Sequence, residues 1–182
     1  MKIVIDGNIG AGKTTQLNLL ESKGFKVHRE PIEKWPLELF YSDPKRWGLT
    51  FQLIILETLE PKDGIHERCP RSSKDVFWRG LPKTPEEDHV YEWAYSHHGW
   101  SPDLYILLNK TPELCMKHIQ NRTQDGDSGV GMKLLNQLDR DYHSMFENLE
   151  CPKFVIDASR TPDEIHENIL SILNEHLPKA GL

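Results

Sequence analysis

The sequence has little of what disulfide-rich and metal-stapled proteins depend on. Only three cysteines occur in 182 residues, and Cys69, Cys115 and Cys151 lie far apart, without the spacing of a metal site. An odd number of scattered cysteines excludes a disulfide framework and favours a reducing compartment. The chain is long enough to bury well over half of its unfolded surface, so it needs no covalent staple.

Surplus positive charge and long apolar runs are also lacking. Lysine and arginine number 22 against 28 acidic residues, a net charge of −6, which excludes the basic footprint of a nucleic-acid-binding protein. No apolar run approaches the length of a membrane span. The N-terminus leads directly into a predicted strand, which leaves no room for a signal peptide. We therefore expect a soluble, cytoplasmic protein with no nucleic-acid or membrane partner.

The apolar pattern alternates between short runs rich in β-branched residues and segments with helical spacing. No repeat or linker divides the chain, which predicts one domain over residues 1–182. Strands alternating with helices favour the α/β class, with a parallel five-stranded sheet flanked by helices on both faces. Strands are predicted at 2–6, 26–30, 65–67, 104–108 and 153–156, and helices from residue 14, at 35–40, 46–59 and 71–80, and after Thr-Pro caps at residues 84, 111 and 161.

Residues 7–14 fit the phosphate-loop pattern G-x-x-x-x-G-K-[ST] between a predicted strand and a predicted helix. Glycines allow successive backbone N–H groups to face inward and cradle phosphate oxygens. Lys13 can reach the outer phosphates of ATP, and the Thr14 hydroxyl can ligate Mg²⁺. A chance glycine-rich turn is the alternative, which the flanking elements disfavour. The motif predicts a three-layer P-loop NTPase fold with ATP contacts from Gly7, Asn8, Ile9, Gly10, Ala11, Gly12, Lys13, Thr14 and Thr15.

Two acidic positions follow predicted strands directly, where parallel sheets place their chemistry. Glu30 follows the second strand and can accept a proton from a substrate hydroxyl. Glu67 and Arg68 end the third strand, and they offer a metal-linked carboxylate beside a cation that steadies a phosphoryl group. From position alone, Glu30 could equally be a surface carboxylate, and Glu67 and Arg68 could equally form a structural ion pair.

Several segments in the same order resemble the deoxyribonucleoside kinases. Residues 30–35, E-P-I-E-K-W, resemble that family's E-P-V-x-x-W segment, and Phe51-Gln52 resembles its base-reading pair. Residues 66–73 are similar to its E-R-S-x-x-S segment, with cysteine in place of the usual first serine. Residues 112–115 followed by Arg122 resemble the lead into the family's lid. The likeness extends from residue 2 to about residue 149.

The resemblance implies an ATP-dependent kinase that phosphorylates the 5′-hydroxyl of a deoxynucleoside. Glu30 would be the base on that hydroxyl, and Arg68 would hold the 5′ oxygen and the phosphoryl group. Lys13 completes the implied catalytic set. Glu67 with Thr14 would organise Mg²⁺, and Arg122 would contact ATP. A homodimer is also implied.

The resemblance further implies how the nucleoside is held. Gln52 would read the base, because one carboxamide offers a donor and an acceptor side by side. Core packing is the alternative for the aromatic residues in this group. The other implied contacts are apolar faces from Trp35, Phe51 and Phe77, and contacts to the 3′-hydroxyl from Tyr41 and Asp127.

The residues around Gln52 bear on the choice of base. Relatives that handle purines and cytosine pair an arginine with an aspartate, whereas the matching positions here are Leu59 and Ser73. Ile55 and Leu59 lie on the same helical face as Gln52 and form an apolar wall that suits a thymine methyl group. We therefore expect thymidine as the preferred substrate, with deoxycytidine and related pyrimidines as secondary ones.

The predicted lid, residues 118–131, departs from the family pattern. Only Arg122 stands at an arginine position, while His118 and Gln124 replace others and Gly126 replaces the first acid. Glycines should make this short lid mobile, and turnover is expected to be slow. Two alternatives stay open: a thymidylate kinase, which the carboxylate of Glu30 disfavours because it would repel a substrate phosphate, and a catalytically weak nucleotide-binding protein.

Overall fold

A parallel sheet of five strands in the order β2-β3-β1-β4-β5 forms the centre of the computed structural model, which describes residues 1–121 and 129–177. Every neighbouring pair of strands runs in the same direction. The predicted α/β class and the five parallel strands are confirmed. The strands are β1 Lys2–Gly7, β2 Val27–His28, β3 Gly64–Glu67, β4 Leu104–Asn109 and β5 Lys153–Asp157.

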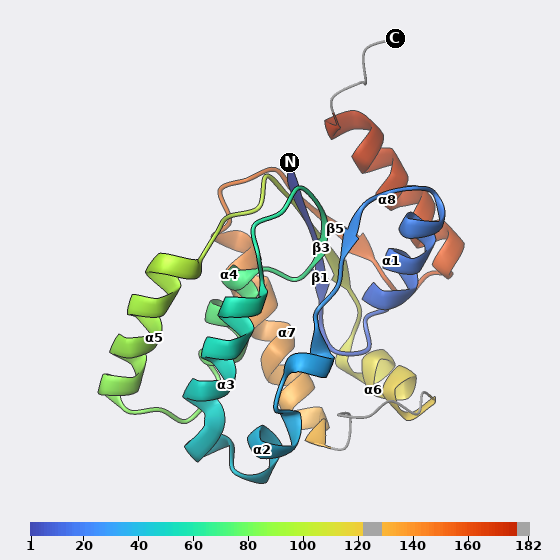
Figure 1. Ribbon diagram of the computed structural model, residues 1–182. Helices are drawn as coiled ribbons and strands as arrows, with labels where there is room; N and C mark the ends of the chain where they lie inside the picture. Colours follow the sequence, from blue (N-terminus) through green and yellow to red (C-terminus); the bar gives the residue numbers. More distant parts are fainter. Residues whose placement is uncertain (122–128, 178–182) are drawn as a thin grey trace.

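Helices cover both faces of the sheet, with α1 and α8 on one side and α3, α4, α5 and α7 on the other (Figure 1). No helix in the described ranges is both long enough and apolar enough to cross a membrane. The helical elements are α1 Lys13–Ser22, η1 Ile32–Lys34, α2 Leu37–Ser42, α3 Pro44–Thr58, α4 Pro70–Ser72, η2 Ser73–Trp78, α5 Pro85–His98, α6 Pro112–Asn121, α7 Met132–Glu147 and α8 Pro162–His176.

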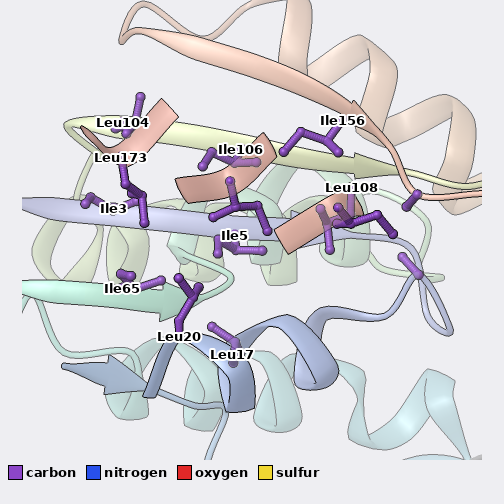
Figure 2. Close-up of a cluster of buried hydrophobic side chains, with 14 of the residues drawn as sticks. Ile3, Ile5, Leu17, Leu20, Ile65, Leu104, Ile106, Leu108, Ile156 and Leu173 are labelled. Carbon is purple, nitrogen blue, oxygen red and sulfur yellow. The ribbon is translucent and has the colours of Figure 1, made fainter. Parts of the chain in front are cut away.

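Alternate residues of the central strands supply two separate cores. Ile3 and Ile5 of β1 face α1 and α8, where Figure 2 shows them beside Leu17 and Leu173. Val4 points to the opposite face and joins the cluster that α7 covers. Because both faces of each central strand are buried, the strands read as continuous apolar runs rather than alternating ones.

Two of the later helices begin with the capping boxes that the sequence predicts. The Thr84 hydroxyl accepts a hydrogen bond from the backbone N–H of Glu87, whose carboxylate accepts one from the Thr84 N–H at 2.7 Å. Thr161 and Glu164 exchange the same pair of bonds at the start of α8. Each box satisfies backbone donors that have no partner inside the helix.

Some predicted elements differ in extent or kind. The strand expected at 26–30 has only two residues, because β2 is an edge strand that pairs with β3 alone and Pro31 soon follows. The helix expected at 35–40 begins at Leu37. The helix expected at 71–80 is mostly a π-helix, η2, in which the Arg79 N–H reaches the Lys74 carbonyl at 3.2 Å. Wider π turns occur frequently at functional sites.

The sequence analysis missed α7 entirely. Its buried residues Leu135, Leu138, Tyr142 and Met145 recur at helical spacing, so a signal was present. No capping side chain marks its start, because Gly131 stands at the N-cap position. The helix nevertheless covers one face of the sheet and borders the site described below.

The substitution Ile106→Ala tests the core assignment. Ile106 is fully buried at the centre of β4, so its truncation should lower the free energy of unfolding by about 2–5 kcal/mol. Val155→Ala on β5 is the control, because Val155 is 49% exposed and its truncation should cost less than about 1 kcal/mol. Urea denaturation measures both, and equal losses would contradict the assignment.

Candidate active site

The phosphate loop follows β1 and approaches two neighbouring elements closely. Gly10 has a φ of 84°, and a Cβ there would lie 2.6 Å from the carbonyl oxygen of Cys115 in α6. A Cβ on Gly7 would lie 2.6 Å from the carbonyl oxygen of Leu108 in β4. These contacts leave no room for a side chain, so both glycines are required by the packing of the loop against the sheet.

Lys13 folds back over this loop at the start of α1. Its Nζ donates hydrogen bonds to the carbonyl oxygens of Gly7, at 3.0 Å, and Asn8, at 3.1 Å. Burial first, and then the nearby positive charge of Arg68, lower the pKa of Lys13 to about 8. The ammonium group is thus poorly hydrated, and anionic phosphate oxygens would be strong partners for it.

Helix α7 holds the loop at two points. The Asn8 side-chain amide donates to the carbonyl oxygen of Leu135 at 2.9 Å. The Tyr142 hydroxyl donates to the fully buried Asp6 carboxylate at 2.8 Å, and the same Asp6 oxygen accepts the Gly7 backbone N–H at 2.8 Å. The end of β1 is therefore fixed by a helix that lies more than a hundred residues away in the sequence.

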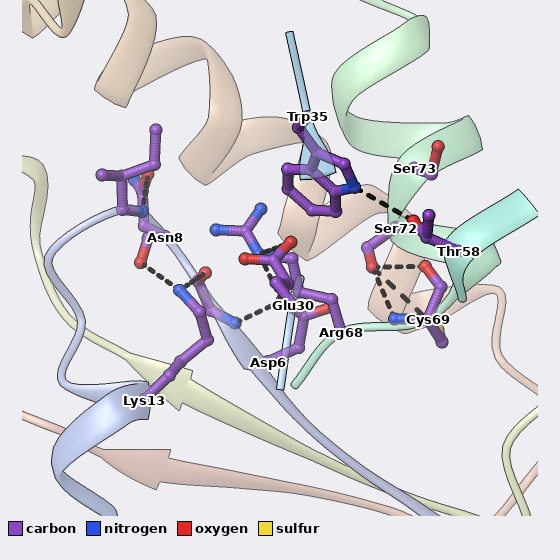
Figure 3. Close-up of polar contacts among 12 residues, drawn as sticks. Asp6, Asn8, Lys13, Glu30, Trp35, Thr58, Arg68, Cys69, Ser72 and Ser73 are labelled. Carbon is purple, nitrogen blue, oxygen red and sulfur yellow. Dashed lines mark hydrogen bonds and ion pairs between the residues drawn. The ribbon is translucent and has the colours of Figure 1, made fainter. Parts of the chain in front are cut away.

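Glu30 and Arg68, from the ends of neighbouring strands, form a buried ion pair. Arg68 Nε lies 3.2 Å from Glu30 Oε1 and 4.0 Å from Asp6 Oδ1 (Figure 3). Arg68 has a φ of 64°, and this left-handed turn ends β3 and directs the chain out of the sheet. Its guanidinium group lies 4.4 Å from the centre of the Phe77 ring, which provides a cation–π contact.

The pKa values of both partners differ from their ordinary values. Burial raises the pKa of Glu30 to about 7, although the positive charge of Arg68 opposes the shift. Burial alone would lower the pKa of Arg68, but the surrounding negative charges, Glu30 foremost, raise it above its ordinary value. Arg68 therefore stays charged, while Glu30 has the pKa that suits a general base at neutral pH.

Glu67 and Thr14 line the same cavity from opposite elements, β3 and α1. The described ranges, 1–121 and 129–177, contain no group of three or more histidine, cysteine or acidic side chains that could enclose a metal ion. Mg²⁺ does not need such a cage, since it usually keeps several waters and binds through one or two protein oxygens plus substrate phosphates. A hydroxyl and a buried carboxylate beside a phosphate loop fit that requirement.

A cavity of about 440 Å³ extends from the phosphate loop past Glu30 to α3 and η2. This volume lies in the range of small-molecule sites. The residues predicted to form the site that line it are Ile9, Gly10, Gly12, Lys13, Thr14, Thr15, Glu30, Trp35, Tyr41, Phe51, Gln52, Ile55, Glu67, Arg68 and Phe77.

The end of the cavity away from the loop combines an apolar wall with one amide. Phe51, Ile55 and Leu59 are buried together, and the Trp35 ring packs edge-on against Phe51 with the ring centres 6.1 Å apart. Gln52 is only 1% exposed, and its carbonyl oxygen accepts a hydrogen bond from the Ser73 hydroxyl at 2.7 Å. This end could hold a flat ring with a polar edge.

Some predicted site residues do not line the cavity. Gly7, Asn8 and Ala11 belong to the loop but are buried and do not border the cavity. Arg122 and Asp127 lie outside the described residues, as does half of the predicted lid. The roles assigned to all these residues stay predictions.

The sequence analysis missed several residues that complete the site. Asp6, Tyr91 and Tyr142 belong to no local motif, and only their contacts reveal them. Helix α7 adds further cavity-lining residues that helical spacing could have indicated: Leu134, Gln137 and Leu138. His118, named in the sequence analysis only as a departure from the lid pattern, also lines the cavity.

Comparisons with known proteins identify relatives of this chain. The family model for deoxynucleoside kinases matches residues 3–178. A probable deoxycytidine kinase of fowlpox virus is 32% identical, with 96% of this chain and 88% of the relative covered. A thymidine kinase of ictalurid herpesvirus 1 is 30% identical, with coverages of 96% and 86%. A solved deoxyadenosine kinase of M. mycoides with bound dATP shares the fold, with a TM-score of 0.82, 23% identity and coverages of 96% and 100%.

The raised pKa of Glu30 predicts a pH-dependent stability. Between pH 4.5 and about 7 the folded protein keeps a proton on Glu30 that the unfolded chain releases, so this group's contribution to stability is lost as the pH rises. The free energy of unfolding of the wild type should therefore fall relative to that of Glu30→Gln, by roughly 1–3 kcal/mol. Urea denaturation at intervals between pH 4.5 and 7.5 measures the difference. Parallel curves for the two proteins would refute the shift.

Proposed function

The chain belongs to the deoxynucleoside kinase family, and from that premise we propose that it transfers the γ-phosphoryl group of ATP to the 5′-hydroxyl of a pyrimidine deoxynucleoside. The chain is thus a phosphotransferase that acts on a deoxynucleoside. The observation that carries the proposal is the buried pair of Glu30 and Arg68, which lies between the phosphate loop and the amide of Gln52. A homodimer and a cytoplasmic location stay predictions from the sequence.

The phosphate loop is the proposed site for the triphosphate of ATP. Its backbone N–H groups and the N-terminus of α1 favour anionic oxygens. Lys13 would leave the loop carbonyls that it now contacts and bind the outer phosphates. Thr14 and Glu67 would hold Mg²⁺, which neutralises charge on the phosphates when bound.

Glu30 and Arg68 are the proposed acceptor machinery. Glu30 takes the proton of the 5′-hydroxyl as the new oxygen–phosphorus bond forms and the bond between the γ-phosphorus and ADP breaks. Arg68 donates hydrogen bonds to the 5′ oxygen and the moving phosphoryl group, whose charge it stabilises. Phe77 packs against the guanidinium group and keeps it in this position.

The remote end of the cavity is the proposed base site. Gln52 would pair with the edge of the ring, while Trp35 and Phe51 supply apolar surface. The wall of Ile55 and Leu59 supports thymidine as a substrate, because a buried methyl group gains about 1 kcal/mol. Deoxycytidine is also a proposed substrate.

The geometry disfavours a monophosphate kinase. A substrate phosphate at the acceptor position would face the carboxylate of Glu30, and the nearest cation, Arg68, is already paired with it. Such a phosphate would be repelled rather than bound.

The direct test is ADP release with Mg²⁺-ATP and each of thymidine, deoxycytidine, deoxyadenosine, deoxyguanosine and thymidine monophosphate. Turnover with the two pyrimidine nucleosides but not with the monophosphate is the expected result. Turnover with the monophosphate alone would replace the proposal with a thymidylate kinase. If none of the five compounds supports ADP release although the protein binds ATP, the chain is a nucleotide-binding protein without this activity.

The substitution Glu30→Gln tests the base. It should lower kcat by about a hundredfold to ten-thousandfold, because the acceptor hydroxyl loses its proton acceptor, while ATP affinity stays unchanged. Glu33→Gln is the matched control, since Glu33 is exposed on the adjacent η1. Steady-state kinetics and calorimetric ATP binding measure both variants. Wild-type turnover in Glu30→Gln would exclude the role.

A further inference from the structure

Three polar side chains form a buried hydrogen-bond chain at the base end of the cavity. The Ser73 hydroxyl lies 2.7 Å from the Gln52 carbonyl oxygen and 2.9 Å from the Tyr91 hydroxyl. Gln52, Ser73 and Tyr91 are 1%, 4% and 0% exposed. Within the described part of the chain, neither hydroxyl has any other hydrogen-bond partner.

The number of hydroxyl hydrogens decides which way the Gln52 amide faces. With the amide oxygen beside Ser73, Tyr91 donates to Ser73 and Ser73 donates to Gln52, so each hydroxyl hydrogen is paired. With the amide nitrogen beside Ser73, that nitrogen must donate to the Ser73 oxygen. Either the Ser73 hydrogen or the Tyr91 hydrogen then has no acceptor. A buried donor without a partner is costly, so the first orientation is favoured.

We propose that Ser73 locks the amide of Gln52 with its oxygen toward Ser73, and that this orientation selects pyrimidines with an amino group at position 4. The proposal rests on the nucleoside kinase function proposed above and names a specificity determinant for it.

The direction of selection follows from the arrangement of the cavity. Figure 3 shows Ser73 on the far side of Glu30 from Lys13. A nucleoside whose 5′-hydroxyl meets Glu30 therefore extends its base toward Ser73. Position 4 of a pyrimidine is opposite the ring nitrogen that carries the sugar, so it reaches deepest and lies beside the Ser73 end of the amide.

The locked amide complements cytosine. Its oxygen accepts from the 4-amino group, while its nitrogen, which has no hydrogen-bond partner among the described residues, donates to ring atom N3. Uracil and thymine reverse both groups and require the flipped amide. The apolar wall recognises a different feature, the substituent at position 5, so the two contributions are separable.

Deoxycytidine and deoxyuridine isolate the lock, because neither has a methyl group and they differ only in the pattern at positions 3 and 4. We measure the ratio of kcat/KM for deoxycytidine over deoxyuridine, which does not depend on the amount of active protein. The wild-type ratio should be about tenfold or more, the effect of one unpaired buried hydrogen. Dissociation constants from calorimetry without ATP should give a ratio in the same direction.

Two variants test the residues of the chain. Ser73→Ala removes the one hydrogen-bond partner that the amide oxygen has among the described residues, and its ratio should fall toward one. Tyr91→Phe is the matched control in the same buried cluster. It leaves the Ser73 hydrogen to donate to Gln52, and a flipped amide would still leave that hydrogen unpaired, so the wild-type ratio should persist.

A wild-type ratio of one or below overturns the proposal, as does a Ser73→Ala ratio equal to that of the wild type. Thermal denaturation establishes that each variant is folded. If a variant does not fold, the ratio of kcat/KM measured for the wild type still tests the proposed orientation of the amide. Protein that neither binds nor phosphorylates either nucleoside overturns the proposed function itself. Turnover of both nucleosides with equal efficiency overturns only the lock.

Discussion

The buried ion pair of Glu30 and Arg68 is the interaction on which the site depends. It joins the ends of β2 and β3 between the phosphate loop and the base end of the cavity. Taking these charged groups out of water carries a desolvation penalty, which their mutual attraction and the contact of Arg68 with Asp6 offset. The same burial that causes this penalty raises the pKa of Glu30 to about 7. The contact that joins the two strand ends therefore also prepares Glu30 to act as a base.

Contacts with α7 hold the phosphate loop in place, in addition to the glycines of the loop itself. Asn8 donates to α7, and Tyr142 of α7 donates to Asp6 directly under the loop. These bonds connect the loop to the helix that follows the predicted lid in the sequence. A displacement of α7 would therefore also move the phosphate loop.

The base end of the cavity divides recognition between two kinds of contact. Ile55 and Leu59 provide shape and apolar surface, which favour a methyl group on the base by about 1 kcal/mol. The amide of Gln52 discriminates through its direction, which the hydroxyl hydrogens of Ser73 and Tyr91 determine. Leu59 and Ser73 are both buried and neutral, so these two positions avoid the cost of burying further charge.

The sequence by itself determined the parallel sheet, the phosphate loop and the candidates Glu30, Gln52 and Arg68. The sheet, the loop and the positions of Glu30 and Arg68 follow from local spacing: glycines within one turn, β-branched runs, and charged residues directly after strands. Gln52 came instead from the resemblance to the deoxyribonucleoside kinases. Only the tertiary structure decided the rest. The bond from Tyr142 to Asp6 joins residues 136 apart, and the contact of Ser73 with Tyr91 joins residues 18 apart. The hydrogen-bond partner of a hydroxyl cannot be read from the sequence, because folding decides which donor or acceptor lies beside it.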